Sequence, residues 1–295
     1  MMPNASVISQ TNLNALSKLI SNAGLQRLMD HDMSKVYGRQ LKKLLNKTGI
    51  SVEGKKSYSE MLSLGYQQLL SYYRHEYLYK TAILNSYVLR EHSLDDTILL
   101  NEFKVGTSKA DIVVVNGTNK VFEIKTELDT PERLQNQVND YFKAFSEVYL
   151  VVHHSMVAKY MGRTDQHVGI MLFMENGEIE TVYTATADHS RLDSTTMLKA
   201  LRKEEYLNLI ENLTGSQPIT KPVHLFTECC RIAKSFSVQT VHIEFLKIIK
   251  QRICRESNEI TLNDATPSYL KFCCYHANLN ENNYIALTKR LNCYI

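Results

Sequence analysis

The stretch KADIVVVNGTNKVFEIKTELDTPERLQNQVNDY (Lys109–Tyr141) decides how the rest of the sequence is interpreted. It contains two short runs rich in β-branched residues, 110–116 and 120–125, on either side of the letters NGTN. Asn-Gly between two such runs is a strong signal for a tight β-hairpin. These letters therefore predict an antiparallel pair of strands joined by a short loop.

A helix and a further strand are expected after this hairpin. The helix is predicted to begin at Pro131, with Thr130 as its capping residue, because a proline in the first helical position loses no hydrogen bond. The run 148–152, VYLVV, is continuously apolar, which is typical of a central strand covered on both faces. A strand, a helix and a strand in this order predict a right-handed parallel crossover.

The flanking segments complete the predicted organisation. Alternating residues at 98–105 and two runs around the letters ENGE predict further strands, whereas helical periodicity marks both ends of the chain. The predicted fold class is α/β, with an α-β-β-β-α-β core and a mixed central sheet. The expected regions are an N-terminal helical region, the core and a C-terminal helical region, at 1–70, 71–190 and 191–295.

The composition is that of an ordinary globular protein. The 295 residues are 44% hydrophobic and 22% charged, and a net charge of +3 does not by itself indicate a nucleic-acid partner. No secretory signal and no run of about 18 apolar residues is present, so no membrane span is expected. The six cysteines lack the spacing of a zinc site and are expected to be reduced thiols. The protein is therefore predicted to be cytoplasmic.

Charged residues on the hairpin raise the question of a metal site. Asp111 lies on the first strand, with Glu123 and Lys125 on the second, and buried charges cost free energy unless they are paired or bind an ion. If residues m and n face each other across the hairpin, m + n is constant, and Asp111 shares a face with Glu123 only when that constant is even. Pairing Val115 with Asn119, or the residue after each, meets this condition with a three-residue loop, whereas a two-residue loop does not.

Two carboxylates on one face at strand ends suit a hard divalent cation. Like charges a few ångströms apart repel unless a cation lies between them, and Mg²⁺ prefers oxygen ligands, including phosphate oxygens. Asp111 and Glu123 are the expected ligands, with the carbonyl of Ile124 as a third. Lys125 can orient a water or stabilise charge on a phosphate. The alternative is a pair of solvated strand ends, with Lys125 paired to a glutamate.

The order of these elements resembles a known family. Asp111, a hairpin, Glu123-Ile124-Lys125, a helix and an apolar strand resemble the core of the PD-(D/E)XK nuclease superfamily, with Ala110 where its motif has proline. The resemblance covers about residues 74–153 and is closest in kind to a small bacterial subfamily often found near mobile elements. It implies a restriction-endonuclease-like core and a Mg²⁺- or Mn²⁺-dependent phosphodiesterase. The implied function is a nuclease that hydrolyses DNA in phage or mobile-element defence or competition.

The resemblance adds three residues to the expected site. Members often carry a glutamate on the helix before the strands, which Glu76 matches, and some carry Q-x-x-x-Y on the helix after the lysine strand, which Gln137 and Tyr141 match. It implies that Glu76 holds the metal or positions water, and that the other two contact the scissile phosphate or brace Lys125. Plainer interpretations stay open: Glu76 as a salt-bridge partner of Lys80, and Tyr141 as a buried core residue.

Weaker candidates lie around these residues. Glu102 has the parity to point toward the same end, Asp129 is expected to serve the helix start, and His153-His154 is expected to be exposed at a strand end. The basic helix at 39–47 is interpreted as a solvated face rather than a DNA clamp. Basic residues that could contact phosphates are Lys104, Lys109 and Arg133.

Two classes of function are compatible with the sequence. The first is the nuclease, with DNA as the expected partner, RNA as a second possibility and no membrane. The second is a non-catalytic nucleic-acid-binding or protein-interaction module that keeps the same fold and binds without cutting. In either class, the C-terminal helices are a candidate surface for a second copy or a partner protein.

Overall fold

The computed structural model describes residues 8–29 and 34–295. They form two compact units, which are described separately. Unit 1 comprises the chain up to Arg90, residues 175–178 and Cys254–Ile295, and unit 2 comprises Glu91–Met174 and Ile179–Ile253. The division into three regions expected from the sequence stays a prediction.

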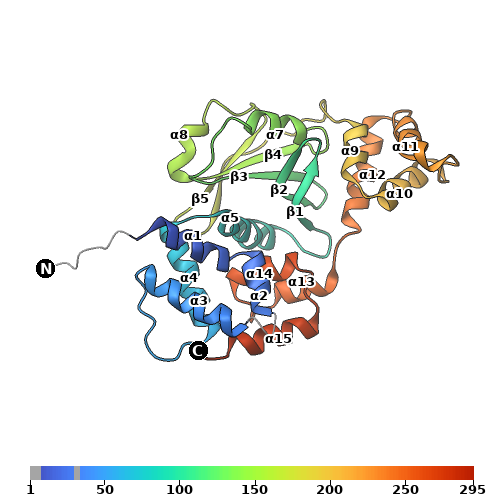
Figure 1. The fold of residues 1–295 in the computed structure, drawn as a ribbon. Helices are drawn as coiled ribbons and strands as arrows, with labels where there is room; N and C mark the ends of the chain where they lie inside the picture. The colour runs from blue at the N-terminus through green and yellow to red at the C-terminus, as the bar shows by residue number, and fades with distance from the viewer. Residues whose placement is uncertain (1–7, 30–33) are drawn as a thin grey trace. The chain divides into compact units, whose positions relative to one another are not determined.

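Unit 2 contains a mixed sheet of six strands in the order β1-β2-β3-β4-β5-β6 (Figure 1). The pairs β1–β2, β2–β3 and β5–β6 are antiparallel, whereas β3–β4 and β4–β5 are parallel. The predicted α/β class with a mixed sheet is therefore confirmed. The strands are β1 (Ile98–Val105), β2 (Ser108–Val115), β3 (Asn119–Lys125), β4 (Glu147–His153), β5 (Gly169–Phe173) and β6 (Ile179–Tyr183).

Helices make up most of the remaining chain. In unit 2 they are α7 (Leu134–Tyr141), η2 (His154–Met156), α8 (Val157–Tyr160), α9 (Ser194–Ala200), α10 (Lys203–Thr214), η3 (Pro222–His224), α11 (Leu225–Ala233) and α12 (Val238–Lys250). In unit 1 they are α1 (Gln10–Leu19), α2 (Asn22–Met29), α3 (Ser34–Lys47), α4 (Tyr58–Tyr72), α5 (Glu76–Ala82), the π-helix η1 (Ile83–Val88), α13 (Arg255–Leu262), α14 (Ser268–His276) and α15 (Glu281–Leu291). The three-residue helix α6 (Leu89–Glu91) lies at the boundary between the units.

The register of the β2–β3 hairpin is one of those that the site hypothesis requires. Val115 pairs with Asn119 and Ile112 with Phe122, so the sum of paired positions is even. The same register, continued toward the start of β2, places Asp111 opposite Glu123. The hairpin therefore has the three-residue loop that the site hypothesis required.

The helix after the hairpin begins later than the sequence predicted. It starts at Leu134, not at Pro131, and the hydroxyl of Thr130 donates to the carboxylate of Glu132 instead of capping the helix. One side of the helix and of the turn after it is buried, because Leu134, Val138, Tyr141, Phe142 and Phe145 belong to the core of unit 2. The VYLVV run is also buried, with β4 between β3 and β5.

A carboxylate of α7 holds the turn between β1 and β2. Asp140, which is 7% exposed, accepts hydrogen bonds from the Thr107 amide (3.0 Å), the Thr107 hydroxyl (2.8 Å) and the Ser108 hydroxyl (2.9 Å). Glycine suits position 106 of this turn, because the φ there is +60° and an added Cβ would lie 2.8 Å from Asp140 Oδ1. Helix α7 thus positions the start of β2, where Asp111 lies.

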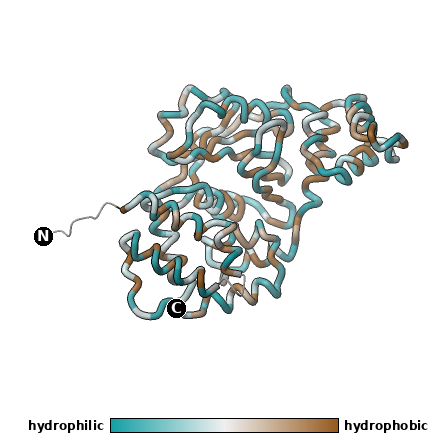
Figure 2. The backbone as a smooth tube through the Cα atoms, viewed as in Figure 1, coloured by the Kyte–Doolittle hydropathy of each residue, from teal (hydrophilic) through white to brown (hydrophobic). Residues whose placement is uncertain are grey.

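The described part of the chain contains no helix with the length and apolar character needed to cross a bilayer. Figure 2 shows the same pattern, with short hydrophobic stretches alternating with hydrophilic ones along the chain.

Replacing Asp140 by alanine is expected to lower the free energy of unfolding by about 2–4 kcal/mol, because several hydrogen bonds to a carboxylate are lost. Burial alone would raise the pKa of Asp140, but hydrogen bonds from Lys143, Thr107 and Ser108 lower it from 3.8 to about 2. A lowered folded-state pKa stabilises the fold above pH 3.8, and this contribution is lost as the pH falls toward 2. Urea unfolding at pH 7 and below pH 3 measures both effects.

Asp264→Ala removes an exposed carboxylate from unit 1 and is the matched control. Equal stability losses for the two variants at pH 7 would contradict the anchoring role of Asp140.

Candidate functional site

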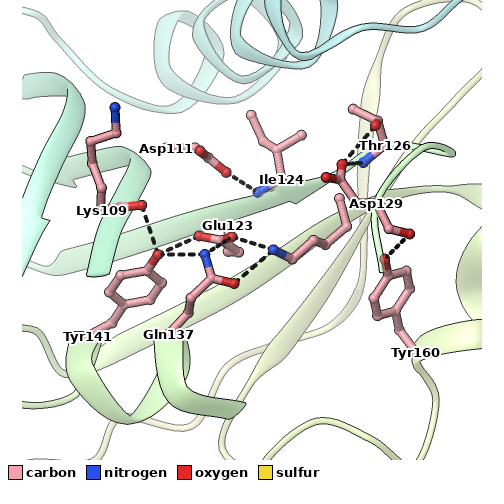
Figure 3. Close-up of polar contacts among 10 residues, drawn as sticks. Lys109, Asp111, Glu123, Ile124, Thr126, Asp129, Gln137, Tyr141 and Tyr160 are labelled. Carbon is pink, nitrogen blue, oxygen red and sulfur yellow. Dashed lines mark hydrogen bonds and ion pairs between the residues drawn. The ribbon is translucent and has the colours of Figure 1, made fainter. Parts of the chain in front are cut away.

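The predicted site residues of unit 2 gather where β3 ends and β2 begins (Figure 3). Glu123 is 2% exposed, and both of its carboxylate oxygens accept hydrogen bonds. Oε1 accepts from Lys125 Nζ (2.7 Å) and Gln137 Nε2 (2.6 Å), and Oε2 accepts from the Tyr141 hydroxyl (2.6 Å). Lys125, 7% exposed, also donates to Gln137 Oε1 (2.8 Å). Two residues of β3 and two of α7 thus form one buried network.

The chemistry of this network follows from its burial. Removal from water raises the pKa of the Glu123 carboxyl, while Lys125, Tyr141 and Gln137 act in the opposite direction. The pKa of Tyr141 is raised well above its usual value, first by burial and then by the nearby Glu123 and Asp111 carboxylates. Tyr141 therefore stays protonated and serves as a hydrogen-bond donor, with the Lys109 carbonyl (3.0 Å) as its other acceptor.

Asp111 has a different role in the geometry. Its Oδ2 accepts a hydrogen bond from the Ile124 amide at 2.7 Å, one step beyond the last pair of the β2–β3 ladder. The carboxylate thus replaces a strand–strand hydrogen bond at the point where the two strands separate. Figure 3 shows Asp111 directed at Ile124, with Glu123 directed at Gln137 and Tyr141. We name this end of the sheet, with Asp111, Glu123, Ile124 and Lys125, the carboxyl edge.

Glu76 does not belong to this network. It lies on α5 of unit 1, where it forms an ion pair with the buried Lys80 four residues later. The plainer interpretation from the sequence, a salt bridge within the helix, therefore describes its contact. Its role as a ligand stays a prediction, as do the roles of the six residues of unit 2.

Two residues near this network, Asp129 and His153, differ from expectation. Asp129 accepts hydrogen bonds from the amide and the hydroxyl of Thr126 (2.8 and 2.7 Å), so it holds the turn after β3, because the helix begins later than expected. His153 is 2% exposed, because β4 extends through it into the interior, so the expectation of exposure is wrong for it. Its ring lies 4.2 Å from that of His154, which is exposed.

Glu102 adopts a conformation that the sequence did not indicate. It lies on β1 with φ of +56°, a left-handed value that is uncommon for residues other than glycine. Its carboxylate pairs with Lys109 at 2.5 Å on the surface. A left-handed backbone is most often signalled by glycine or asparagine, and position 102 has neither.

The donors present limit the kind of metal that the carboxyl edge could hold. Within residues 8–29 and 34–295, no group of three or more histidine, cysteine, aspartate or glutamate side chains is placed to hold a metal ion. The carboxyl edge offers two carboxylates and main-chain oxygens. This set suits Mg²⁺, which typically takes one or two carboxylates and completes its shell with water or phosphate oxygens.

Comparison with known proteins identifies the family. The model of the family "Bacteriophage P4 protein cII" matches residues 70–269. The chain belongs to the bacteriophage P4 cII family. A curated member, Protein cII of Enterobacteria phage P4, is 26% identical over 196 residues, which cover 61% of this chain and 73% of the phage protein. A solved structure, a protein of unknown function from Silicibacter pomeroyi, is 12% identical with a TM-score of 0.30, over 48% of this chain and 93% of that one.

Membership of the P4 cII family corrects the resemblance drawn from the sequence. The match spans the whole motif stretch, so the assignment to the PD-(D/E)XK superfamily is wrong, and so is the nuclease function in defence or competition. The acid–x–lysine letters have a simpler physical cause in this P4 cII family protein, since Lys125 is the counter-ion of the buried Glu123. A motif of so few letters has a high rate of chance matches.

Replacing Lys125 by methionine is expected to destabilise the protein by about 3–5 kcal/mol at pH 7, because it leaves a buried carboxylate without its cation. The loss of the cation raises the folded-state pKa of Glu123 further. Stability is then retained below the ordinary carboxyl pKa of 4.5 and is lost as the pH rises through the raised value. Chemical unfolding between pH 4 and 8 measures this dependence.

Lys104→Met removes an exposed lysine from β1 and is the control. A penalty for Lys125→Met that stays constant from pH 4 to 8 would show that lost packing, not the unpaired carboxylate, destabilises the variant.

Proposed function

We propose that this P4 cII family protein binds DNA and that a divalent cation at the carboxyl edge takes part in the binding. The observation that carries the proposal is the hairpin register: one residue beyond the last pair, Ile112–Phe122, its continuation puts Asp111 opposite Glu123 at the end of a parallel strand pair. Ligands of open α/β sheets bind outside the carboxyl ends of the parallel strands.

The charge of this region is the reason for including a cation. The loop that follows β3, residues 126–132, carries Glu127, Asp129 and Glu132 and no basic residue, and the carboxylates of Asp111 and Glu123 belong to the same edge of the sheet. A DNA phosphate placed there meets like charge, which is unfavourable in a partly buried site. A divalent cation removes the conflict, because carboxylate and phosphate oxygens can share one Mg²⁺ or Mn²⁺ ion.

The residues present fit such an ion. A carboxylate offers about four lone-pair positions, and Glu123 uses three of them for Lys125, Gln137 and Tyr141. Asp111 and Glu123 would hold the ion, with the carbonyl of Ile124 as a third ligand. Bound there, the cation would supply a positive charge that attracts a phosphate oxygen. Lys125 pairs with Glu123 and lowers the pKa of its carboxyl against the effect of burial.

The finer description of the fold is part of the same proposal. Three antiparallel strands, β1 to β3, are followed by α7 and the parallel β4. This order supports a restriction-endonuclease-like core, a term that here describes the architecture and not an activity. We also propose that the protein is cytoplasmic. Whether the protein is also an enzyme stays a prediction from the sequence.

The proposal predicts that Mg²⁺ tightens DNA binding. Divalent cations normally weaken electrostatic binding to DNA, because they compete as counter-ions, so an increase in affinity identifies an ion held by the protein. We expect about a tenfold lower Kd for a fluorescein-labelled DNA duplex in Mg²⁺ than in chelator at equal ionic strength, or about 1.4 kcal/mol. Fluorescence anisotropy measures it, with an RNA duplex as a second probe.

Asp111→Asn is expected to abolish this gain, because it removes a charge while leaving an oxygen that can accept from the Ile124 amide. Asp129→Asn is the matched control, since it makes the same change on a residue that is not a proposed ligand. Equal affinity of the wild-type protein in Mg²⁺ and in chelator would refute the cation site.

A further inference from the structure

Helix α3 of unit 1 concentrates positive charge to a degree that the rest of the chain does not. It carries five cations and no acidic residue. The net charge of the chain is +3, so the remaining residues together carry 3 − 5 = −2. Four of the cations recur at every fourth position and therefore share one side of the helix. We name Lys35, Arg39, Lys43 and Lys47 the α3 basic face.

The α3 basic face is exposed and makes no ion pair within the part of the chain that the structure describes. Many other surface cations have acidic neighbours, as Arg231 has in Glu228 and Lys247 in Glu244. Like charges four residues apart destabilise a helix, and the α3 basic face contains three such pairs. Folding alone does not favour this arrangement.

The opposite side of α3 is used by the fold. Tyr37, Leu41 and Leu45 are fully buried, and the Tyr37 hydroxyl donates to the Leu19 carbonyl at 2.9 Å. Helix α3 packs on α1 and α4 with these residues. Its apolar side is therefore not available for insertion into a lipid surface, and the helix offers a partner only charge. This favours a polyanion over a membrane.

The spacing of the α3 basic face suits a nucleic-acid backbone. Residues four apart rise about 6 Å along a helix, so the four cations span about 18 Å. One strand of duplex DNA places a phosphate about every 3.4 Å along its axis, so this length covers about five phosphates. Long, flexible side chains at this spacing can neutralise several phosphates without reading base edges.

We infer that the α3 basic face binds the phosphate backbone of duplex DNA, independently of sequence and of divalent cations. The inference rests on the proposed function for the identity of the partner, but it concerns another unit and another kind of contact. The sequence favoured a solvated face for this helix, and the salt dependence of DNA binding distinguishes the two interpretations.

The test is the salt dependence of DNA binding in chelator, where the cation site makes no contribution. Each phosphate contact adds about 0.9 to the slope of log Kd against log salt concentration. The variant Lys35→Gln/Arg39→Gln/Lys43→Gln/Lys47→Gln is therefore expected to lower the slope by about 3.6. At four contacts, this slope corresponds to a change in affinity of about a hundredfold between 50 and 200 mM salt. Glutamine keeps helix propensity close to that of lysine, and circular dichroism checks the fold.

The half-variant Lys43→Gln/Lys47→Gln has a matched control in Lys203→Gln/Lys234→Gln, which removes two exposed lysines of unit 2. We expect the first to lower the slope by about 1.8 and the second to leave it unchanged. An unchanged slope in the folded four-site variant overturns the inference, and so does a loss of binding to phosphatidylserine vesicles with DNA binding intact. The Mg²⁺-dependent gain tested with Asp111→Asn is separate, because the four-site variant should keep that gain.

Discussion

The ion pair between Glu123 and Lys125 is the interaction on which the centre of unit 2 depends. Both charges lie at the end of β3, which is flanked by β2 and β4, and both side chains are buried from water. Desolvation of two charges costs several kcal/mol, and it is offset only when the pair is close and its remaining hydrogen-bonding capacity is used. Gln137 and Tyr141 meet that requirement from α7. The network therefore joins α7 to the sheet in addition to the packing of its apolar residues.

The same helix also determines where β2 begins. Through Asp140 it holds the turn that leads into β2, and through Tyr141 it contacts the main chain of Lys109. Asp111 follows two residues later and completes the ladder at the Ile124 amide. Two anchors on one helix thus set the position of both carboxylates of the carboxyl edge. Charge, and not hydrophobic contact alone, aligns the hairpin with the helix.

The hairpin and its two strands could be predicted because their determinants are local: Asn-Gly marks the turn and β-branched runs mark the strands. The register could not, because a two-residue and a three-residue loop give opposite parities, and only the structure shows the pairing of Val115 with Asn119. The buried position of His153 depends on how far β4 extends, which is decided by its neighbours in the sheet. The predicted start of α7 was wrong for a related reason, because the Thr130 hydroxyl donates to the Glu132 carboxylate instead of capping the helix. The role of Lys125 could not be separated from that of a reactive lysine, because the letters are the same whether the partner is a buried glutamate or a phosphate.

The parallel pairing of β3 and β4 also constrains the order in which unit 2 can assemble. The antiparallel meander from β1 to β3 needs only short turns, so it can form from contacts close in sequence. β4 cannot join until the crossover that contains α7 has closed, and only that step removes Glu123 and Lys125 from water. The desolvation of the pair therefore belongs to a late stage of folding. The strength of the Glu123–Lys125 ion pair should therefore affect the rate of unfolding more than the rate of folding.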